Sequence, residues 1–197
     1  MEFSERVGAS TEPEAAQPSI GLIESASIAK GFEIADAVAK RSPVQLLWAR
    51  TVSPGHHLTL FAGDVSETTY AFERGVEVGG KAVLDRMLIP NVHVDLVPAI
   101  RGPRRVDLSE ALGIVELKTV ASTVLAADAA AKACAVELVE VRLAMHLGGK
   151  GFFLLAGETG DVEEAVAAAV ERARARDALV RDVVIPRLSA ELAEHIV

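Results

Sequence analysis

The 197-residue chain has a single cysteine, few aromatic residues and no excess of positive charge. One cysteine, Cys134, cannot form an intrachain disulfide. Twenty Lys and Arg residues against 28 Asp and Glu residues give a net charge of -8, so the chain lacks the overall basic field that nucleic-acid-binding proteins use. Charges also interrupt every apolar run well before the ~20 residues that a membrane-spanning helix needs. We therefore expect neither nucleic acid nor a membrane as a partner.

Apolar residues are abundant although aromatic residues are not. They make up 50% of the chain against 4% aromatic, and the mean hydropathy of +0.30 excludes wholesale disorder. Because small domains bury a limited fraction of their own surface, this excess favours an oligomer. Residues 1–18 differ, since acidic residues stand there among Pro, Ser, Thr and Ala, which predicts a flexible acidic extension. They contain no apolar segment of a signal peptide, so a cytoplasmic location is expected.

The sequence contains an internal repeat. Residues 21–50 recur at an offset of 92, with identical residues at 11 of 30 positions. The identities include glycine, Glu, Asp, Lys and Arg, which a bias toward alanine does not explain. The offset grows to 94 at Ala62-Gly63-Asp64 and to 96 at Ile89-Pro90, and such length changes usually fall in loops. The chain is therefore predicted to hold two copies of a unit of about 90 residues.

Both copies predict the same order of elements, which is strand, helix, strand, strand, helix, strand and a short final helix. Such an order is typical of an α+β layer of helices on an antiparallel sheet. The second and third strands are expected to form a hairpin across a glycine-containing loop. The predicted strands span 21–24, 44–50, 58–62 and 83–89 in the first copy, and 113–116, 136–142, 152–156 and 179–185 in the second.

The starts of the helices are predicted from hydroxyl and acidic residues. Ser27 and Thr119 precede apolar residues at helical spacing, so each is expected to cap the first helix of its copy. Asp64 with Glu67, and Asp161 with Glu164, have the spacing of a capping box and predict the start of the second helix. In the second strand, Val44, Leu46 and Trp48 alternate with other residues, which predicts that they share one face.

In these features both copies resemble the bacterial microcompartment (BMC) shell domain, here as a tandem-domain shell protein. The motifs are Gly-Leu-Ile-Glu and Gly-Ile-Val-Glu at the openings, Ala-Asp-Ala-Val-Ala-Lys and Ala-Asp-Ala-Ala-Ala-Lys in the first helices, and Val-Ile-Pro-Arg at 184–187. The resemblance implies an α+β fold of two tandem ferredoxin-like-type BMC domains, each an antiparallel sheet with helices packed on it. Each copy opens with its Gly-containing strand, as in the unpermuted class. We assign 1–18 to the extension, 19–100 and 111–197 to the domains, and 101–110 to the linker.

The resemblance implies a structural protein and not an enzyme. Tandem relatives form pseudohexameric homotrimers that tile into shell facets with hexameric and pentameric shell proteins, so the chain is expected in the shell of a microcompartment. A lysine at the end of the first helix and an arginine after Ile-Pro lie at tile edges in the family. The matching residues are Lys40, Lys132 and Arg187, with Asn91 in place of the arginine in the first copy. The alternative for these lysines is a solvated helix end favoured by the helix dipole.

The resemblance also assigns the hairpin loops to a central pore for small metabolites. Three chains would bring three copies of each histidine and of Lys150 together, which would make the loop ring weakly cationic and favour small anionic or polar metabolites. The alternative is that these are simply polar turn residues. The expected pore-lining residues are Ser53, Pro54, Gly55, His56, His57, His146, Leu147, Gly148, Gly149, Lys150 and Gly151.

No cofactor is expected. Some tandem relatives hold an iron–sulfur cluster through a pore cysteine, and Gly151 stands at the matching position here. A ring of three His57 imidazoles is the remaining hypothesis for a metal. The recurring carboxylates of Glu24, Glu116, Asp36 and Asp128 lack a neighbouring nucleophile or phosphate loop, so structural hydrogen bonding explains them better than acid–base catalysis. The competing functional class is a small-molecule-binding regulatory trimer of ferredoxin-like domains.

Overall fold

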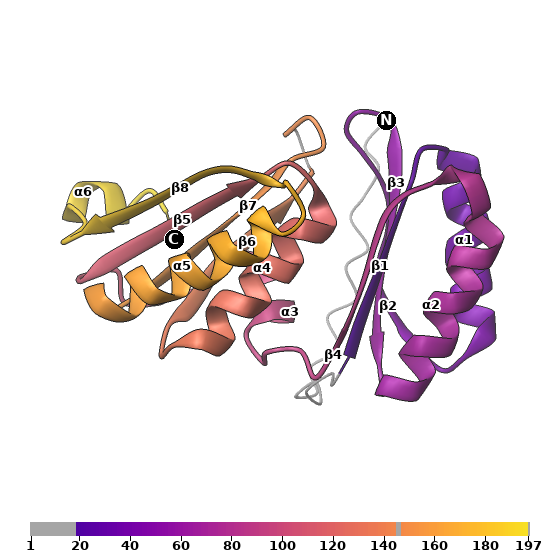
Figure 1. The fold of residues 1–197 in the computed structure, drawn as a ribbon, viewed down its shortest axis with the longest axis horizontal. Helices are drawn as coiled ribbons and strands as arrows, with labels where there is room; N and C mark the ends of the chain where they lie inside the picture. The colour runs from indigo at the N-terminus through magenta and orange to yellow at the C-terminus, as the bar shows by residue number, and fades with distance from the viewer. Residues whose placement is uncertain (1–18, 145–146, 197) are drawn as a thin grey trace, which may run out of the picture.

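The computed structural model describes residues 19–144 and 147–196, which form two similar α+β units that pack against each other (Figure 1). In the first unit the elements are β1 (Ser19–Ser25), α1 (Ile28–Arg41), β2 (Gln45–Val52), β3 (His56–Gly63), α2 (Val65–Gly79), the short 3-10 helix η1 (Gly80–Ala82), β4 (Val83–Pro90) and α3 (Leu96–Arg101). In the second unit they are β5 (Ala111–Leu117), α4 (Val120–Ala133), β6 (Glu137–Leu143), β7 (Gly151–Gly157), α5 (Thr159–Arg174), β8 (Leu179–Pro186) and α6 (Ala190–Ala193).

Each unit has one four-stranded antiparallel sheet with two helices on one of its faces, which confirms the predicted α+β fold. The strand orders are β2-β3-β1-β4 and β6-β7-β5-β8. The registers also repeat, because Ser19 is opposite Pro90 and Ala111 is opposite Pro186. The shift from an offset of 92 to one of 96 therefore marks equivalent positions in space. Equivalent residues of the two copies can be compared one by one.

The recurring glycine of the opening strand is required by close packing across the sheet. A Cβ atom built on Gly21 would overlap the ring of Phe61 in β3, and one built on Gly113 would lie 2.7 Å from Cδ1 of Leu155 in β7. Both neighbours are fully buried. The side chain of the neighbouring strand thus covers the glycine, which explains why Gly recurs in the opening motif of both copies.

The predicted helix caps are confirmed for the first helix of each copy and are wrong in part for the second. The Ser27 hydroxyl accepts a hydrogen bond from the Lys30 N–H at 3.3 Å, and Thr119 accepts one from the Ser122 N–H at 3.2 Å. Asp64 is the N-cap residue of α2, but its side chain makes no capping hydrogen bond. Asp161 lies in the first turn of α5, because that helix begins at Thr159 after Glu158. At the offset of 94 the equivalent of Asp64 is Glu158, so the two helices begin at equivalent positions.

The expected alternation in the second strand is wrong at Trp48. Leu46 is opposite Phe61 and Trp48 is opposite Leu60, so the strand has a bulge at Leu47. A bulge inserts one extra residue and moves the following side chains to the other face. Trp48 therefore points away from Leu46, and the Arg50 guanidinium lies over its ring at 3.4 Å. The equivalent bulge follows Leu138 in β6.

The two units share one continuous core. The sheet face of the first unit that α1 and α2 leave open packs against α4 of the second unit. Helix α3 packs on α4 and on β6, so it also bridges the units. The shared core includes Ile20, Leu22, Leu58, Leu60, Met87, Leu96, Val120 and Val124. None of the described helices has the length and apolar character to cross a membrane.

Candidate functional site

The two hairpin loops lie at the same end of the chain and touch each other. The β2–β3 turn contains Ser53 to Gly55, and the β6–β7 loop contains Leu147 to Lys150; Figure 1 shows both at one edge of the molecule. A Cβ atom built on Gly149 would lie 3.6 Å from Cδ of Pro54. Gly55, Gly148 and Gly149 have φ angles of 101°, 62° and 88°, a region that favours glycine. His146, also expected in this loop, lies outside the described residues.

The basic residues beside these loops are paired with carboxylates. His56 lies 2.8 Å from the Glu24 carboxylate, and the Lys150 ammonium lies 2.9 Å from that of Glu116. The two pairs are equivalent in the repeat, which gives the recurring glutamates a structural role. Because each basic group faces a carboxylate of its own chain, the expected cationic character of the loops is offset by two negative charges. The loops therefore present polar backbone and basic groups that each face a carboxylate.

His57 occupies a different place from the one expected for a loop residue. It lies in β3 with its side chain fully buried beneath α1, and its ring centroid is 4.8 Å from that of Phe32. Burial lowers the pKa of His57, because the charged imidazole would lose its hydration. At the equivalent position Gly151 lies beneath α4, where a Cβ atom would overlap the Thr123 hydroxyl. His57 and Gly151 therefore belong to the contacts between helix and sheet.

The residues beside the loops do not fit an iron–sulfur cluster. Such clusters are held by cysteine thiolates, and the sole cysteine of the chain, Cys134, follows α4 at its C-terminal end. Burial, together with the negative charge of Glu164, raises the pKa of the Cys134 thiol, which keeps it protonated and weakly reactive. Within residues 19–144 and 147–196, no three His, Cys, Asp or Glu side chains are grouped closely enough to hold a metal ion.

The expected edge residues lie on the surface of both units. The Lys40 ammonium is 2.7 Å from Asp36, and that of Lys132 is 2.6 Å from Asp128, so each lysine pairs with the aspartate four residues earlier. Asn91 and Arg187 follow the last strands with φ angles of 54° and 52°. The different side chains at this position thus share one left-handed backbone conformation. Such a turn directs the chain away from the sheet at the same point in both copies.

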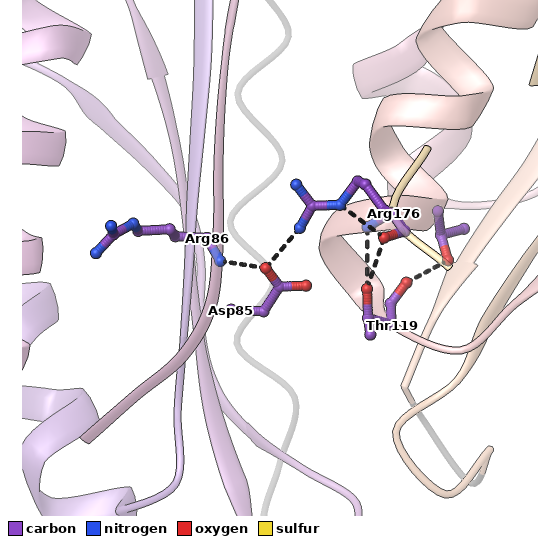
Figure 2. Close-up of polar contacts among 6 residues, drawn as sticks. Asp85, Arg86, Thr119 and Arg176 are labelled. Carbon is purple, nitrogen blue, oxygen red and sulfur yellow. Dashed lines mark hydrogen bonds and ion pairs between the residues drawn. The ribbon is translucent and has the colours of Figure 1, made fainter. Parts of the chain in front are cut away.

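Polar contacts across the two units were not foreseen from the sequence. Arg176 follows α5, and its guanidinium lies 2.7 Å from Asp85 in β4 and 3.0 Å from the Ser122 hydroxyl (Figure 2). A second contact joins the His93 N–H to Oδ1 of Asp128 at 2.8 Å. The recurrence of aspartate at 36 and 128 was the available signal for the second contact. Nothing comparable marks Asp85 and Arg176, because Arg181 and Gly80 stand at the equivalent positions.

Among residues 19–144 and 147–196, the contact between the units has no counterpart on the other side of either unit. Phe32 on α1 is 56% exposed, whereas its equivalent Val124 on α4 is fully buried against the first sheet. On the sheets the second copy is the exposed one, because Val183 in β8 is exposed and its equivalent in the first copy, Met87, is buried. Five of the ten large apolar side chains that are exposed in the described chain have a buried equivalent: Ile28, Phe32, Leu46, Val183 and Leu192, against Val120, Val124, Leu138, Met87 and Leu96.

These five side chains form two separate faces. Ile28, Phe32 and Leu46 belong to what we call the helix face of the first unit, on α1 and β2. Val183 and Leu192 belong to the sheet face of the second unit, on β8 and α6. A hollow of about 450 Å³ opens on the sheet face between Ile114, Glu116, Lys150 and Phe152. In the other copy, residues equivalent to Ile114 and Phe152 are Leu22 and Leu58, which are buried in the shared core.

Comparisons with known proteins agree with these observations. A family model described as the BMC domain matches residues 19–92 and again 111–188. The chain is 42% identical over 168 residues to the bacterial microcompartment shell protein PduT of Citrobacter freundii, covering 85% of this chain and 91% of that protein. A solved microcompartment protein from Desulfitobacterium hafniense is 43% identical with a TM-score of 0.84, covering 89% and 98% of the two chains. The fused permuted hexameric shell protein MSM0275 from the RMM microcompartment shares the fold, with 21% identity and a TM-score of 0.60 over 79% and 81%.

Proposed function

The chain belongs to the BMC-domain family and is a structural shell protein of a bacterial microcompartment, and we propose that three copies close into a ring of six similar domains. Each chain would supply two adjacent domains of the ring. Three further contacts between chains would then complete the circle, each of them equivalent to the contact inside the chain. The ring would be a pseudohexameric tile of the shell.

The observation that carries the proposal is the pair of unpartnered faces. The helix face of one chain contains α1, the equivalent of α4, which packs on the first sheet inside the chain. The sheet face of another chain belongs to the second sheet, the equivalent of the sheet on which α4 packs. Two different surfaces of this kind form a heterologous interface, which closes into a ring when the rotation per unit divides a full turn. Exposed Phe32 opposite the hollow at Ile114 and Phe152 gives such an interface an aromatic anchor.

The paired loops support a pore on the axis of this ring. Because the β2–β3 and β6–β7 loops of one chain already touch, a ring of three chains would bring six such loops toward its centre. Backbone N–H groups at the positive-φ glycines, together with the Glu24–His56 and Glu116–Lys150 pairs, would surround the opening. Because a carboxylate faces each basic group at the opening, passage of small polar metabolites would not depend on a cationic ring.

The outer edge of the ring would contact neighbouring tiles. Lys40 and Lys132 lie in the last turns of the first helices of the two units, and Asn91 and Arg187 follow the last strands, so these four positions would alternate around the perimeter. Neighbours would include single-domain hexamers and pentamers of the same shell. The recurring carboxylates serve structural pairs, and the proposed role includes no catalysis.

Single-particle electron microscopy of the purified chain, with its mass measured by light scattering, tests the proposal. We expect a mass of three chains and a disc with a central opening lined by residues 53–55 and 147–150. Mixed with a single-domain shell protein, the discs should extend into sheets or closed shells. A stable monomer, or a trimer that forms neither discs nor sheets, would contradict the proposal, and the second result would favour a regulatory trimer.

A further inference from the structure

Asp36 and Asp128 are equivalent aspartates with different surroundings. In Asp128, Oδ2 lies 2.6 Å from the Lys132 ammonium, and Oδ1 accepts a hydrogen bond from the His93 N–H at 2.8 Å. In Asp36, Oδ2 likewise pairs with Lys40 at 2.7 Å. The Asp128 side chain is 9% exposed, whereas that of Asp36 is 60% exposed. The ion pair with lysine is therefore present in both copies, whereas the hydrogen bond to the other unit is present only at Asp128.

The donor of this contact also has an equivalent. His93 precedes α3, and at the offset of 96 the matching residue is Ser189, the N-cap residue of α6. Helix α3 has four buried residues between the units. Helix α6 has none, and its Leu192, the equivalent of buried Leu96, is exposed. In the part of the chain that the structure describes, both the acceptor Asp36 and the donor segment around Ser189 are thus left uncovered.

The packing of α3 shows where this segment would lie. Helix α3 packs on α4 and on β6, where Leu125, Asp128 and Leu138 are buried. The equivalent residues of the first copy, Glu33 and Asp36 on α1 and Leu46 on β2, are exposed. The surface of α1 and β2 is therefore open where its equivalent in the second copy is covered.

We propose that Oδ1 of Asp36 accepts a hydrogen bond from the backbone N–H of the partner subunit's Ser189, and that the partner's α6 packs on α1 and β2 as α3 packs on α4 and β6. This inference rests on the proposed ring and adds a specific closing contact to it. The contact repeats the His93–Asp128 bond between chains, so that each aspartate joins two domains. A hydrogen bond to a charged acceptor contributes more than a neutral one, so Asp36 makes ring closure sensitive to one side chain.

Cross-linking of engineered thiols tests the contact. In a Cys134→Ser background, Asp36→Cys is combined with Ser189→Cys and treated with a short bifunctional thiol reagent. We expect denaturing gels to show covalent species of two and three chains. The matched control combines Asp128→Cys with His93→Cys, which should cross-link within one chain and leave the band at the mass of a monomer.

The stability of the ring gives a second measurement. Asp36→Ala should raise the protein concentration at which trimers dissociate by at least about tenfold, as expected for loss of a charged hydrogen bond. Asp36→Asn retains an acceptor and should lose less. Lys40→Ala removes only the ion pair within the chain and should leave trimer dissociation unchanged.

The outcomes separate this contact from the ring itself. Trimers that give no cross-link between chains, while the control pair reacts, would overturn the contact and leave the proposed ring intact. An unmodified chain that is monomeric by light scattering would overturn both. Equal dissociation of the wild type and Asp36→Ala would show that the aspartate has no part in closure.

Discussion

Helices α1 and α4 occupy equivalent positions in the repeat, yet they differ greatly in burial. Eleven of the 14 residues of α4 are buried, against four of the 14 in α1. Helix α4 lies between its own sheet and the open face of the first sheet, whereas α1 covers its own sheet and leaves the other side exposed. The comparison teaches that the burial of each helix depends on the neighbouring domain, because a second domain covers the outer side of α4 and none of the described residues covers that of α1 in the same way.

The sequences of the two helices reflect this difference. Within α4 the charged residues are Asp128 and Lys132, both of which recur in α1. Helix α1 adds Lys30, Glu33 and Arg41. A surface that meets its partner inside the chain is covered as soon as the chain folds, whereas a surface between chains must remain soluble until assembly. We therefore expect the contact between chains to be more polar than the contact within the chain.

The largest effect should come from placing a charge at the two equivalent apolar positions. Val124→Asp puts a carboxylate in the shared core without a partner, and we expect it to lower the free energy of unfolding by about 3–5 kcal/mol. Phe32→Asp puts the same charge on an exposed face and should leave each chain folded while preventing trimer formation. Urea denaturation followed by circular dichroism measures the first effect, and light scattering measures the second.

Tyr70→Asp provides the control for Phe32→Asp. Tyr70 is 53% exposed on α2 and does not belong to the helix face. The variant should remain trimeric and folded. If Phe32→Asp stays trimeric, or if Val124→Asp is as stable as the wild type, the two helices do not differ in the way that their burial indicates.

An intermediate effect is expected where the two copies exchange a small and a large residue. Gly31 of α1 faces His57, whereas Thr123 of α4 faces Gly151, and a Cβ atom on either glycine would overlap its neighbour. Gly31→Thr should therefore destabilise the protein by about 1–3 kcal/mol through overpacking, although glycine is a poor helix former. Adding His57→Gly creates the arrangement of the second copy and should restore most of the loss. Urea denaturation of the two single variants and the double variant gives the coupling energy.

Thr123→Gly with Gly151→His is the matched exchange in the second copy. Gly151→His alone should be destabilising, and Thr123→Gly should relieve it. Losses that simply add in both double variants would show that the residue pairs do not compensate for each other.

The order of the elements and the fold could be predicted because the internal repeat shows the sequence pattern of each helix and strand twice. Ser27 and Thr119 were recognisable as caps, since a hydroxyl before helical spacing has one common structural role. The bulge that turns Trp48 to the other face could not be recognised, because a bulged strand and a regular one have the same composition.

The surroundings of the loops were harder to predict than the loops themselves. The glycines and Pro54 marked the turn between β2 and β3, but sequence position could not show that His57 begins the buried part of the strand. Nor could it show that Glu24 and Glu116 reach the basic residues beside the loops, which lie 32 and 34 positions away. Both facts depend on which face of a strand a residue occupies, and one residue of register reverses that face.

The smallest effect concerns the pH dependence that His57 gives to the first copy alone. Burial lowers the pKa of His57 in the folded chain below the ordinary value of 6.5. Below pH 6.5 the unfolded chain therefore binds more protons than the folded chain, so stability should fall as the pH decreases from 7 toward 5 and should not depend on His57 above 7. The slope from one proton cannot exceed about 1.4 kcal/mol per pH unit. Urea denaturation between pH 5 and 8 measures it. The double variant Gly31→Thr with His57→Gly, which has the uncharged packing of the second copy, should lose this part of the pH dependence; an unchanged slope would assign it to other groups.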